Sequence, residues 1–325
     1  MNKPQIVLYF PVPLDVLRLL QEHFHVTSFD RVDSSNRDAF LEAVFEADGL
    51  IGMGLPVPTG DLRGARRLKA IATISTGYDA FDVAELTSQQ VILMNLYDPL
   101  TETTADLAFS LILATGRRIA ELDHRVREGQ WTHAVTRGWF GLDIHGKTLG
   151  IVGMGRIGAA IARRGALGFG MRVLYTARSP KPDVDAAYGA CKCALDELLA
   201  VSDFVCLVVP LTDDTRHLIG SRELSLMKPS AILVNIARGP VVDEMALVDA
   251  LKSGTIHGAG LDVYEVEPLP VDSGLLEMRN VVLAPHIGSA TAETRDAMAR
   301  YAAHSLVGFL TRGEVRNVVN PEAMS

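Results

Sequence analysis

The chain has 325 residues and a formal net charge of −8, from 31 Lys and Arg against 39 Asp and Glu. Its length favours two domains, because single hydrophobic cores rarely grow past about 250 residues. Hydrophobic residues make up 48% of the chain and charged residues 22%, an ordinary globular composition that excludes long disordered regions. The acidic balance argues against nucleic acid or an anionic membrane surface as a partner.

The cysteines and the N-terminal segment indicate the compartment. Cys191, Cys193 and Cys206 are too few and too close for a disulfide framework, so we expect reduced thiols in a cytoplasmic protein. The apolar run Ile6–Pro11 is interrupted by prolines and is typical of a first strand, not of a signal peptide. No uninterrupted apolar stretch reaches the roughly 18 residues that a membrane span requires, so no membrane partner is expected.

The first part of the chain alternates short apolar runs with helical patterns, which predicts a parallel α/β sheet. We expect helices near residues 14–23 and 37–46, and strands near 5–9, 26–29, 49–51, 70–74 and 91–94.

Residues 101–130 carry one long helical pattern. It begins at TETTAD, which resembles a helix N-terminus, and ends at Gly129. Leu107 and Leu111 recur at helical spacing. The segment is too apolar for a solvated linker, so we expect a single helix that joins two domains or packs on a partner subunit.

A second alternating series begins at Gly146. We expect strands near residues 148–152, 171–176, 204–209, 231–235, 258–261 and 281–284, and helices near 156–167, 195–201, 222–227 and 244–253. A last helix near residues 292–310 and an extended tail follow. The predicted fold class is therefore α/β, with two doubly wound parallel-sheet domains.

The sequence GMGRIG indicates a dinucleotide site. Gly153, Gly155 and Gly158 lie between a predicted strand and a predicted helix, where glycines permit a tight turn, close approach of a diphosphate and helix–strand packing. The free N–H groups near Arg156 and Ile157, at the helix start, would face the diphosphate.

The end of the next strand bears on the choice of dinucleotide. NAD enzymes carry an acidic residue there, which binds the ribose hydroxyls. This chain has Thr176, followed by Arg178 and Ser179. Because a guanidinium binds a 2′-phosphate through paired charge-assisted hydrogen bonds, the sequence favours NADP(H) and leaves NAD(H) open. The alternative, that Arg178 is only a solvated loop charge, also stays open.

Arg238, Glu267 and His286 each follow a different predicted strand of the second series. The carboxyl ends of parallel strands open on one crevice, where a dinucleotide also binds. Their chemistry suits hydride transfer to a keto acid: His delivers a proton to the new alkoxide, the carboxylate favours the imidazolium and orients the ring, and Arg holds the substrate carboxylate and polarises the keto oxygen.

The motifs GMGRIG, VNIARGP, DVYEVEP and PHIGSAT, with ISTGYDAFD and TETTADLAF, together resemble those of the D-isomer-specific 2-hydroxyacid dehydrogenases over essentially the whole chain. The family's catalytic residues fall on Arg238, Glu267 and His286. The resemblance implies a Rossmann cofactor domain, residues 95–289, inserted in a flavodoxin-like substrate domain of residues 1–94 and 290–325. It also implies a homodimer built through the cofactor domain and the long helix.

The same resemblance implies further binding residues. It places the substrate carboxylate on the backbone amides of Thr76 and Gly77. It places Asp262 near the nicotinamide amide, and Thr104 and Pro210 along the cofactor.

Within the family, the chain resembles the bacterial glyoxylate/hydroxypyruvate reductases that also reduce 2-ketogluconate. The expected partner is therefore a small 2-keto or 2-hydroxy acid. Met53–Leu55, in a segment less polar than in such reductases, is expected to form the wall beside the substrate's tail, with an aromatic residue of the region 139–140 reaching in from the partner subunit. Leu55 and Ser289 complete the expected substrate-binding residues.

Three other functions stay open. Some relatives of this fold are dinucleotide-sensing co-repressors, others oxidise formate or phosphite, and a different 2-keto acid is a third alternative. We expect no metal site, since the pair His23 and His25 has no third ligand at suitable spacing.

Overall fold

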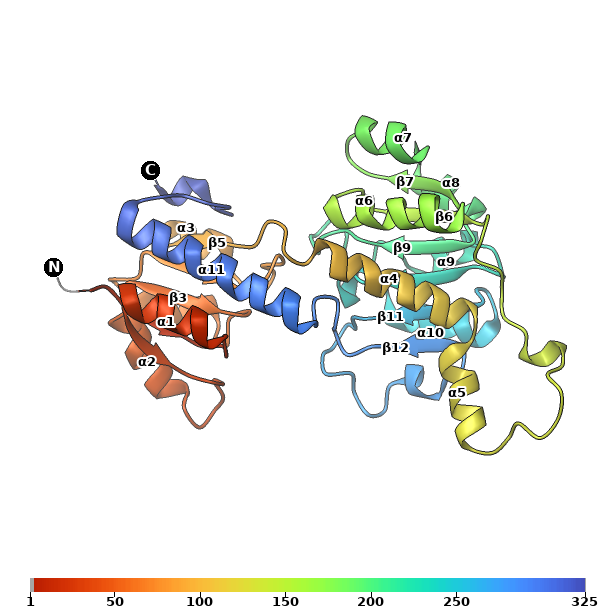
Figure 1. Ribbon diagram of the computed structural model, residues 1–325, viewed down its shortest axis with the longest axis horizontal. Helices are drawn as coiled ribbons and strands as arrows, with labels where there is room; N and C mark the ends of the chain where they lie inside the picture. The colour runs from red at the N-terminus through yellow and green to blue at the C-terminus, as the bar shows by residue number, and fades with distance from the viewer. Residues whose placement is uncertain (1–2, 325) are drawn as a thin grey trace. The chain divides into compact units, whose positions relative to one another are not determined.

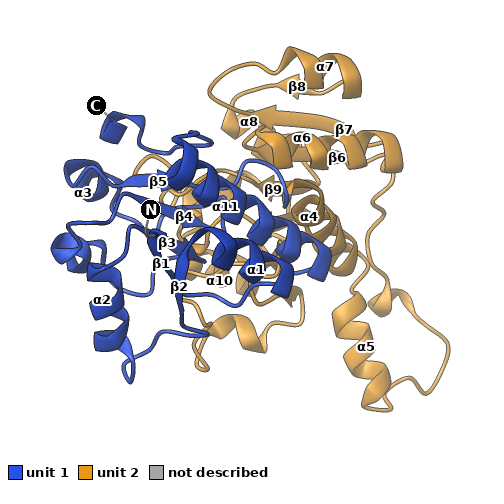
Figure 2. Cartoon of the chain, turned by 60° about the vertical axis from the view of Figure 1, so that its left-hand side comes forward, with its two compact units in different colours: residues 1–100, 290–325 blue, residues 101–289 orange. Residues whose placement is uncertain are grey.

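A computed structural model describes residues 3–324, which form two compact units. Unit 1 comprises the chain up to Leu100 and again from Ala290, and unit 2 comprises Thr101–Ser289 (Figure 2). Within the described residues no helix is both long and apolar enough to cross a membrane. That unit 1 is the substrate domain and unit 2 the cofactor domain stays a prediction.

Unit 1, whose strands are red to orange in Figure 1, is built on a five-stranded parallel sheet. The strand order is β2-β1-β3-β4-β5. Its strands are β1 (Gln5–Leu8), β2 (His25–Ser28), β3 (Gly49–Gly52), β4 (Ala70–Thr73) and β5 (Ile92–Met94). Strands β3 and β4 are buried along their whole length, which explains their continuous apolar sequence.

Helices cover both faces of this sheet. Side chains of α1 and α11 pack on one face, and side chains of α2 and α3 pack on the other. The bounds are α1 (Leu14–His23), α2 (Arg37–Phe45), α3 (Val83–Ser88) and α11 (Ala292–Arg312), with 3-10 turns at Thr59–Gly64 and Pro321–Met324. The prediction of an extended tail was wrong for its last turn, although Val318 does pair with Met94.

Unit 2 is built on a seven-stranded parallel sheet in the order β12-β11-β10-β9-β6-β7-β8. Its strands are β6 (Thr148–Val152), β7 (Arg172–Thr176), β8 (Cys191–Lys192), β9 (Phe204–Leu207), β10 (Ile232–Asn235), β11 (Gly258–Leu261) and β12 (Val281–Leu283). Two parallel sheets thus confirm the predicted fold class. Cys206 lies fully buried in β9.

Helices also cover both faces of the larger sheet. Apolar side chains of α4 and α6 pack on one face, and those of α8, α9 and α10 pack on the other. The bounds are α4 (Thr101–Gly116), α5 (Ile119–Arg127), α6 (Arg156–Arg163), α7 (Pro182–Tyr188), α8 (Leu195–Val201), α9 (Ser221–Leu226) and α10 (Glu244–Ser253), with 3-10 turns at Arg137–Trp139, Gly239–Val241 and Gly274–Glu277 and a π turn at Arg164–Gly168.

The single helix expected over residues 101–130 is in fact two helices, so that prediction was wrong. The break falls at Arg118, whose φ of 56° lies in the left-handed region and cannot continue an α-helix. Its guanidinium binds both carboxylate oxygens of Glu121, at 2.8 and 2.9 Å, and donates to the carbonyl of Gly138. These polar contacts stabilise the turn that apolar periodicity alone does not reveal.

Candidate active site

The loop after β6 has the geometry of a dinucleotide-binding turn. Gly153 has a φ of 102°, which favours glycine, and its N–H donates to the carbonyl of Thr176 at 2.9 Å. A Cβ at Gly158 would lie 2.3 Å from the carbonyl oxygen of Gly153, so this glycine lets α6 pack against the loop. Both glycines are therefore required by the protein's own structure.

Gly155 differs from these two glycines. Its φ is −83°, and a Cβ there would meet nothing within 4 Å. Neither strain nor packing calls for a glycine at this position. Open space beside the first turn of α6, where Arg156 and Ile157 lie, is what a diphosphate needs to approach the backbone. The loop therefore fits a dinucleotide.

Arg178 and Ser179 lie two and three residues beyond the end of β7, and both are exposed. Among residues 3–324, Arg178 forms no hydrogen bond or ion pair, so its five N–H donors are available to a ligand. The nearby Lys181 amide is fixed by the hydroxyl of Tyr175 at 2.8 Å.

The three residues expected to perform the chemistry lie at the carboxyl edge of the same sheet. Arg238 follows β10, Glu267 follows β11 and His286 follows β12, and these strands are neighbours. His286 Nδ1 lies 2.7 Å from Glu267 Oε2, with about half of the His286 side chain exposed. The other carboxylate oxygen of Glu267 accepts the N–H of Tyr264 at 3.0 Å, which fixes its orientation.

Two close contacts join the loops that carry these residues. A Cβ at Gly239 would lie 1.8 Å from the backbone of Tyr264, so only glycine lets the Arg238 loop approach the Glu267 loop. The buried Tyr264 hydroxyl donates to the carbonyl of Ala284 at 2.9 Å, which ties the Glu267 loop to the end of β12. Burial raises the pKa of Tyr264 to about 12, so this phenol remains a donor.

The segment that carries His286 is held by Asp262 and Thr104. The two oxygens of the buried Asp262 carboxylate accept the N–H groups of Ile287, at 2.7 Å, and Gly288, at 2.9 Å. The hydroxyl of Thr104, in α4, donates to the carbonyl of Gly288 at 3.0 Å. Burial is the largest influence on the Asp262 carboxyl and raises its pKa. Sequence reasoning missed this positioning role, because no local pattern links residues so far apart.

Pro210 and Ser289, the remaining expected residues of unit 2, form no hydrogen bond with this network among the described residues. Pro210 follows β9, and its carbonyl accepts the hydroxyl of Thr215 at 2.6 Å. Ser289 is the last residue of unit 2 and is partly buried. Their roles in binding stay predictions.

In unit 1, Thr76 and Gly77 follow β4, and side chains bind the carbonyl groups of both residues. The carbonyl of Thr76 accepts the side-chain amide of Asn95 at 2.8 Å, and the carbonyl of Gly77 accepts the hydroxyl of Ser75 at 2.6 Å. The N–H groups of Thr76 and Gly77 have no acceptor among the described residues. Two free, adjacent N–H groups are a suitable pair of donors for a carboxylate. Leu55 lies in the loop after β3, the neighbouring strand.

Comparison with known proteins identifies the family of the chain. Residues 109–288 match the family model described as "D-isomer specific 2-hydroxyacid dehydrogenase, NAD binding domain". The chain is 51% identical over 322 residues to glyoxylate/hydroxypyruvate reductase B of Yersinia pestis (strain Pestoides F), with 99% of each chain covered. The chain belongs to the D-isomer specific 2-hydroxyacid dehydrogenases.

Solved structures support this membership. A protein called TT0316 from Thermus thermophilus is 39% identical, with a TM-score of 0.89 over 97% of this chain and 99% of that one. An NADPH-dependent glyoxylate/hydroxypyruvate reductase from Sinorhizobium meliloti, solved with NADP and malonate, is 33% identical, with a TM-score of 0.84 over 99% and 98% of the two chains. The chain is thus an oxidoreductase whose cofactor is a nicotinamide dinucleotide.

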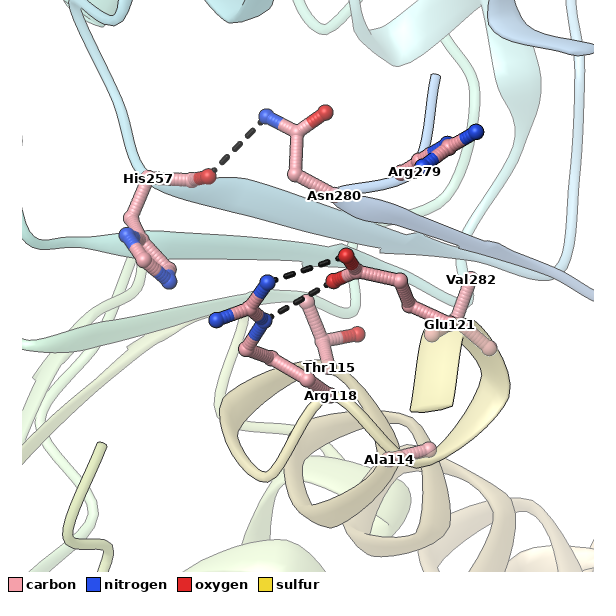
Figure 3. Close-up of a pocket in the computed structure, with 8 residues that line it drawn as sticks. All are labelled: Ala114, Thr115, Arg118, Glu121, His257, Arg279, Asn280 and Val282. Carbon is pink, nitrogen blue, oxygen red and sulfur yellow. Dashed lines mark hydrogen bonds and ion pairs between the residues drawn. The ribbon is translucent and has the colours of Figure 1, made fainter. Parts of the chain in front are cut away.

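None of the candidate active-site residues lines a cavity of about 400 Å³ in this dehydrogenase, which Figure 3 shows. His257 and Asn280, which line it, precede β11 and β12, so the cavity lies at the amino edge of the sheet. Arg118, at the break between α4 and α5, and Glu121, in the first turn of α5, also line the cavity and form an ion pair. The cavity is therefore separate from the carboxyl edge that carries His286.

The pair formed by Glu267 and His286 leads to a prediction about pH. Glu267→Gln keeps an acceptor for Tyr264 but removes the negative charge that favours the imidazolium. If His286 delivers the proton, reduction needs the protonated ring, and activity of the variant should then decline at a lower pH than activity of the parent enzyme. The measurement is the pH profile of kcat/KM for 2-keto acid reduction.

The matched control is Glu265→Gln, because Glu265 binds His217 at 2.6 Å instead of His286. Its profile should follow that of the parent. If the profile of Glu267→Gln also stays unchanged, Glu267 is not the partner of the proton donor.

Proposed function

We propose that this dehydrogenase reduces small 2-keto acids to D-2-hydroxy acids with NADPH, and that His286 is the proton donor. The contact between His286 and Glu267, beside the Arg238 loop and on the sheet that carries the dinucleotide turn, is the observation that supports the proposal most strongly. The names of the relatives, which are glyoxylate/hydroxypyruvate reductases, support the same reaction.

The proposed mechanism assigns one task to each side chain. The turn that carries Gly153 and Gly155 and the start of α6 would hold the diphosphate of a nicotinamide dinucleotide, which would supply the hydride for the keto carbon. Arg238 holds the substrate and offsets the negative charge that develops on the keto oxygen. His286 donates its Nε2 proton to that oxygen, while Nδ1 keeps its own proton on the Glu267 carboxylate, which accepts hydrogen bonds only. The amides of Thr76 and Gly77 bind the substrate carboxylate.

The free guanidinium of Arg178 supports a preference for NADP(H). It would bind the 2′-phosphate of the cofactor, and no carboxylate among the described residues pairs with it. Ser179 beside it supplies a further hydroxyl donor. The reductase from Sinorhizobium meliloti, described as NADPH-dependent, has the same fold.

Exposed apolar side chains on α5 and the loop that follows it support a homodimer built through unit 2. This arm projects from the sheet in Figure 1. Its large exposed hydrophobic residues are Ile119, Val126, Trp131, Val135 and Phe140. So many on one arm are typical of a surface that a second subunit covers.

Two rival functions make different predictions. A dinucleotide-sensing binding protein would bind NADPH without turning over any 2-keto acid. A formate or phosphite dehydrogenase would oxidise those ions and leave 2-keto acids unreduced. The intact set of Arg238, Glu267 and His286 favours the reductase.

Cofactor preference is the first test. The parent enzyme should use NADPH at least about tenfold more efficiently than NADH in kcat/KM, which corresponds to roughly 1.4 kcal/mol of differential binding. Arg178→Ala should remove most of this preference by weakening NADPH alone. Steady-state kinetics with both cofactors decide the matter, and equal efficiency in the parent would contradict the assignment.

Substrate choice is the second test. Hydroxypyruvate, glyoxylate and 2-ketogluconate share a carboxylate beside a carbonyl, the pair of groups that the proposed mechanism requires. We expect all three to be reduced with NADPH and phenylpyruvate to be poor, because the segment Met53–Leu55 restricts a bulky tail. Faster turnover of phenylpyruvate than hydroxypyruvate would contradict this role of the segment; failure of all three would contradict the substrate class.

A further inference from the structure

Arg295, in the first turns of α11, is a partly buried cation without an anionic partner. Its Nη1 donates to the thioether sulfur of Met53 at 2.8 Å, and the guanidinium forms no other hydrogen bond or ion pair within residues 3–324. A thioether is a weak acceptor, so this contact satisfies little of a guanidinium with five N–H donors.

Two other arginines of α11, unlike Arg295, bind carboxylates. Arg300 binds the carboxylate of Asp15 at 2.7 Å, and Arg312 binds that of Glu314 at 2.6 Å. These partners raise the pKa of both guanidinium groups, whereas burial lowers the pKa of Arg295. Removing a cation from water without a partner costs free energy, and a ligand oxygen would offset that cost.

The position of Arg295 indicates which ligand. Met53 directly follows β3, and the register pairs Gly52 with Thr73 at the end of β4. The N–H of Ile74 donates to the carbonyl of Gly52 at 2.7 Å, so the chain beyond β3 and the chain beyond β4 leave the sheet side by side. The free amides of Thr76 and Gly77 lie on the second of these segments. Arg295 therefore lies at the same edge of unit 1 as the proposed carboxylate-binding amides.

We propose that Arg295 determines specificity by binding an oxygen on carbon 3 of the 2-keto acid. This inference rests on the proposed function. Met53 and Leu55 offer no good hydrogen-bond partner for a hydroxylated tail, and Arg295, which contacts Met53, supplies one. It selects substrates with a hydroxyl or carboxylate oxygen at carbon 3 over substrates with a bare methyl group. Its role is binding, and the proton chemistry remains with His286.

Hydroxypyruvate and pyruvate form the matched substrate pair, because they differ by one hydroxyl at carbon 3. The experiment measures kcat/KM for both, with NADPH, in the parent, Arg295→Met, Arg295→Lys and the control Arg300→Met. Arg295→Met should lower the hydroxypyruvate-to-pyruvate ratio about 10- to 100-fold, as expected for loss of a hydrogen bond to a charged group. Arg295→Lys keeps the positive charge but loses the planar guanidinium, so its ratio should lie between those of the parent and Arg295→Met. Arg300→Met should keep the parent's ratio.

Thermal unfolding separates binding from a structural role. If Arg295 serves the substrate, Arg295→Met should not lower the Tm, since an uncompensated cation has been removed. An equal loss on both substrates together with a lower Tm would overturn the inference, as would an unchanged ratio. If Arg295→Met fails to fold, the hydroxypyruvate-to-pyruvate ratio of Arg295→Lys is the test: a lowered ratio supports the inference and an unchanged ratio overturns it. A parent enzyme that reduces neither hydroxypyruvate nor glyoxylate contradicts the proposed function itself, a result distinct from an unchanged ratio in the variants.

Discussion

Two hydrogen bonds from backbone amides to the Asp262 carboxylate fix the segment that carries His286. The N–H groups of Ile287 and Gly288 converge on this buried side chain, and Asp262 also accepts the N–H of His286 through its backbone carbonyl at 2.9 Å. One residue at the end of β11 thus binds three consecutive amides after β12. The orientation of His286 follows from that arrangement.

The arrangement has a conformational cost. His286 has a φ of 53°, a left-handed conformation that a residue with a side chain adopts at roughly 1–3 kcal/mol. Three amide hydrogen bonds and the donation from Thr104 to Gly288 offset this cost. The strained turn directs the imidazole toward Glu267, whose own loop is fixed by Tyr264 and by the close approach of Gly239. Helix α4, strand β11 and strand β12 therefore all contribute to one side-chain position.

Much of this organisation was predictable from sequence, and the failures have physical causes. Apolar runs predicted both parallel sheets, because buried parallel strands leave a continuous signal. The short helices α3 and α7 and the two-residue strand β8 gave no such signal. The break at Arg118 depends on an ion pair with Glu121 that periodicity does not detect. Strand ends predicted that Arg238, Glu267 and His286 share one edge, whereas the support from Asp262 and Thr104 depends on tertiary contacts.

Replacement of Asp262 by Asn tests the positioning of His286 most directly. Asn has one side-chain oxygen, so its NH2 group would face one of the two backbone N–H groups, of Ile287 or Gly288, that the Asp262 carboxylate accepts. The His286 segment should therefore shift. We expect kcat at saturating NADPH to fall at least about tenfold, a loss that a higher Kd for NADPH cannot explain. Asp203→Asn, at the amino edge of the same sheet, should retain the parent's kcat. An unchanged kcat in Asp262→Asn, or a weakened NADPH affinity with full kcat at saturation, would contradict the claim that Asp262 positions His286.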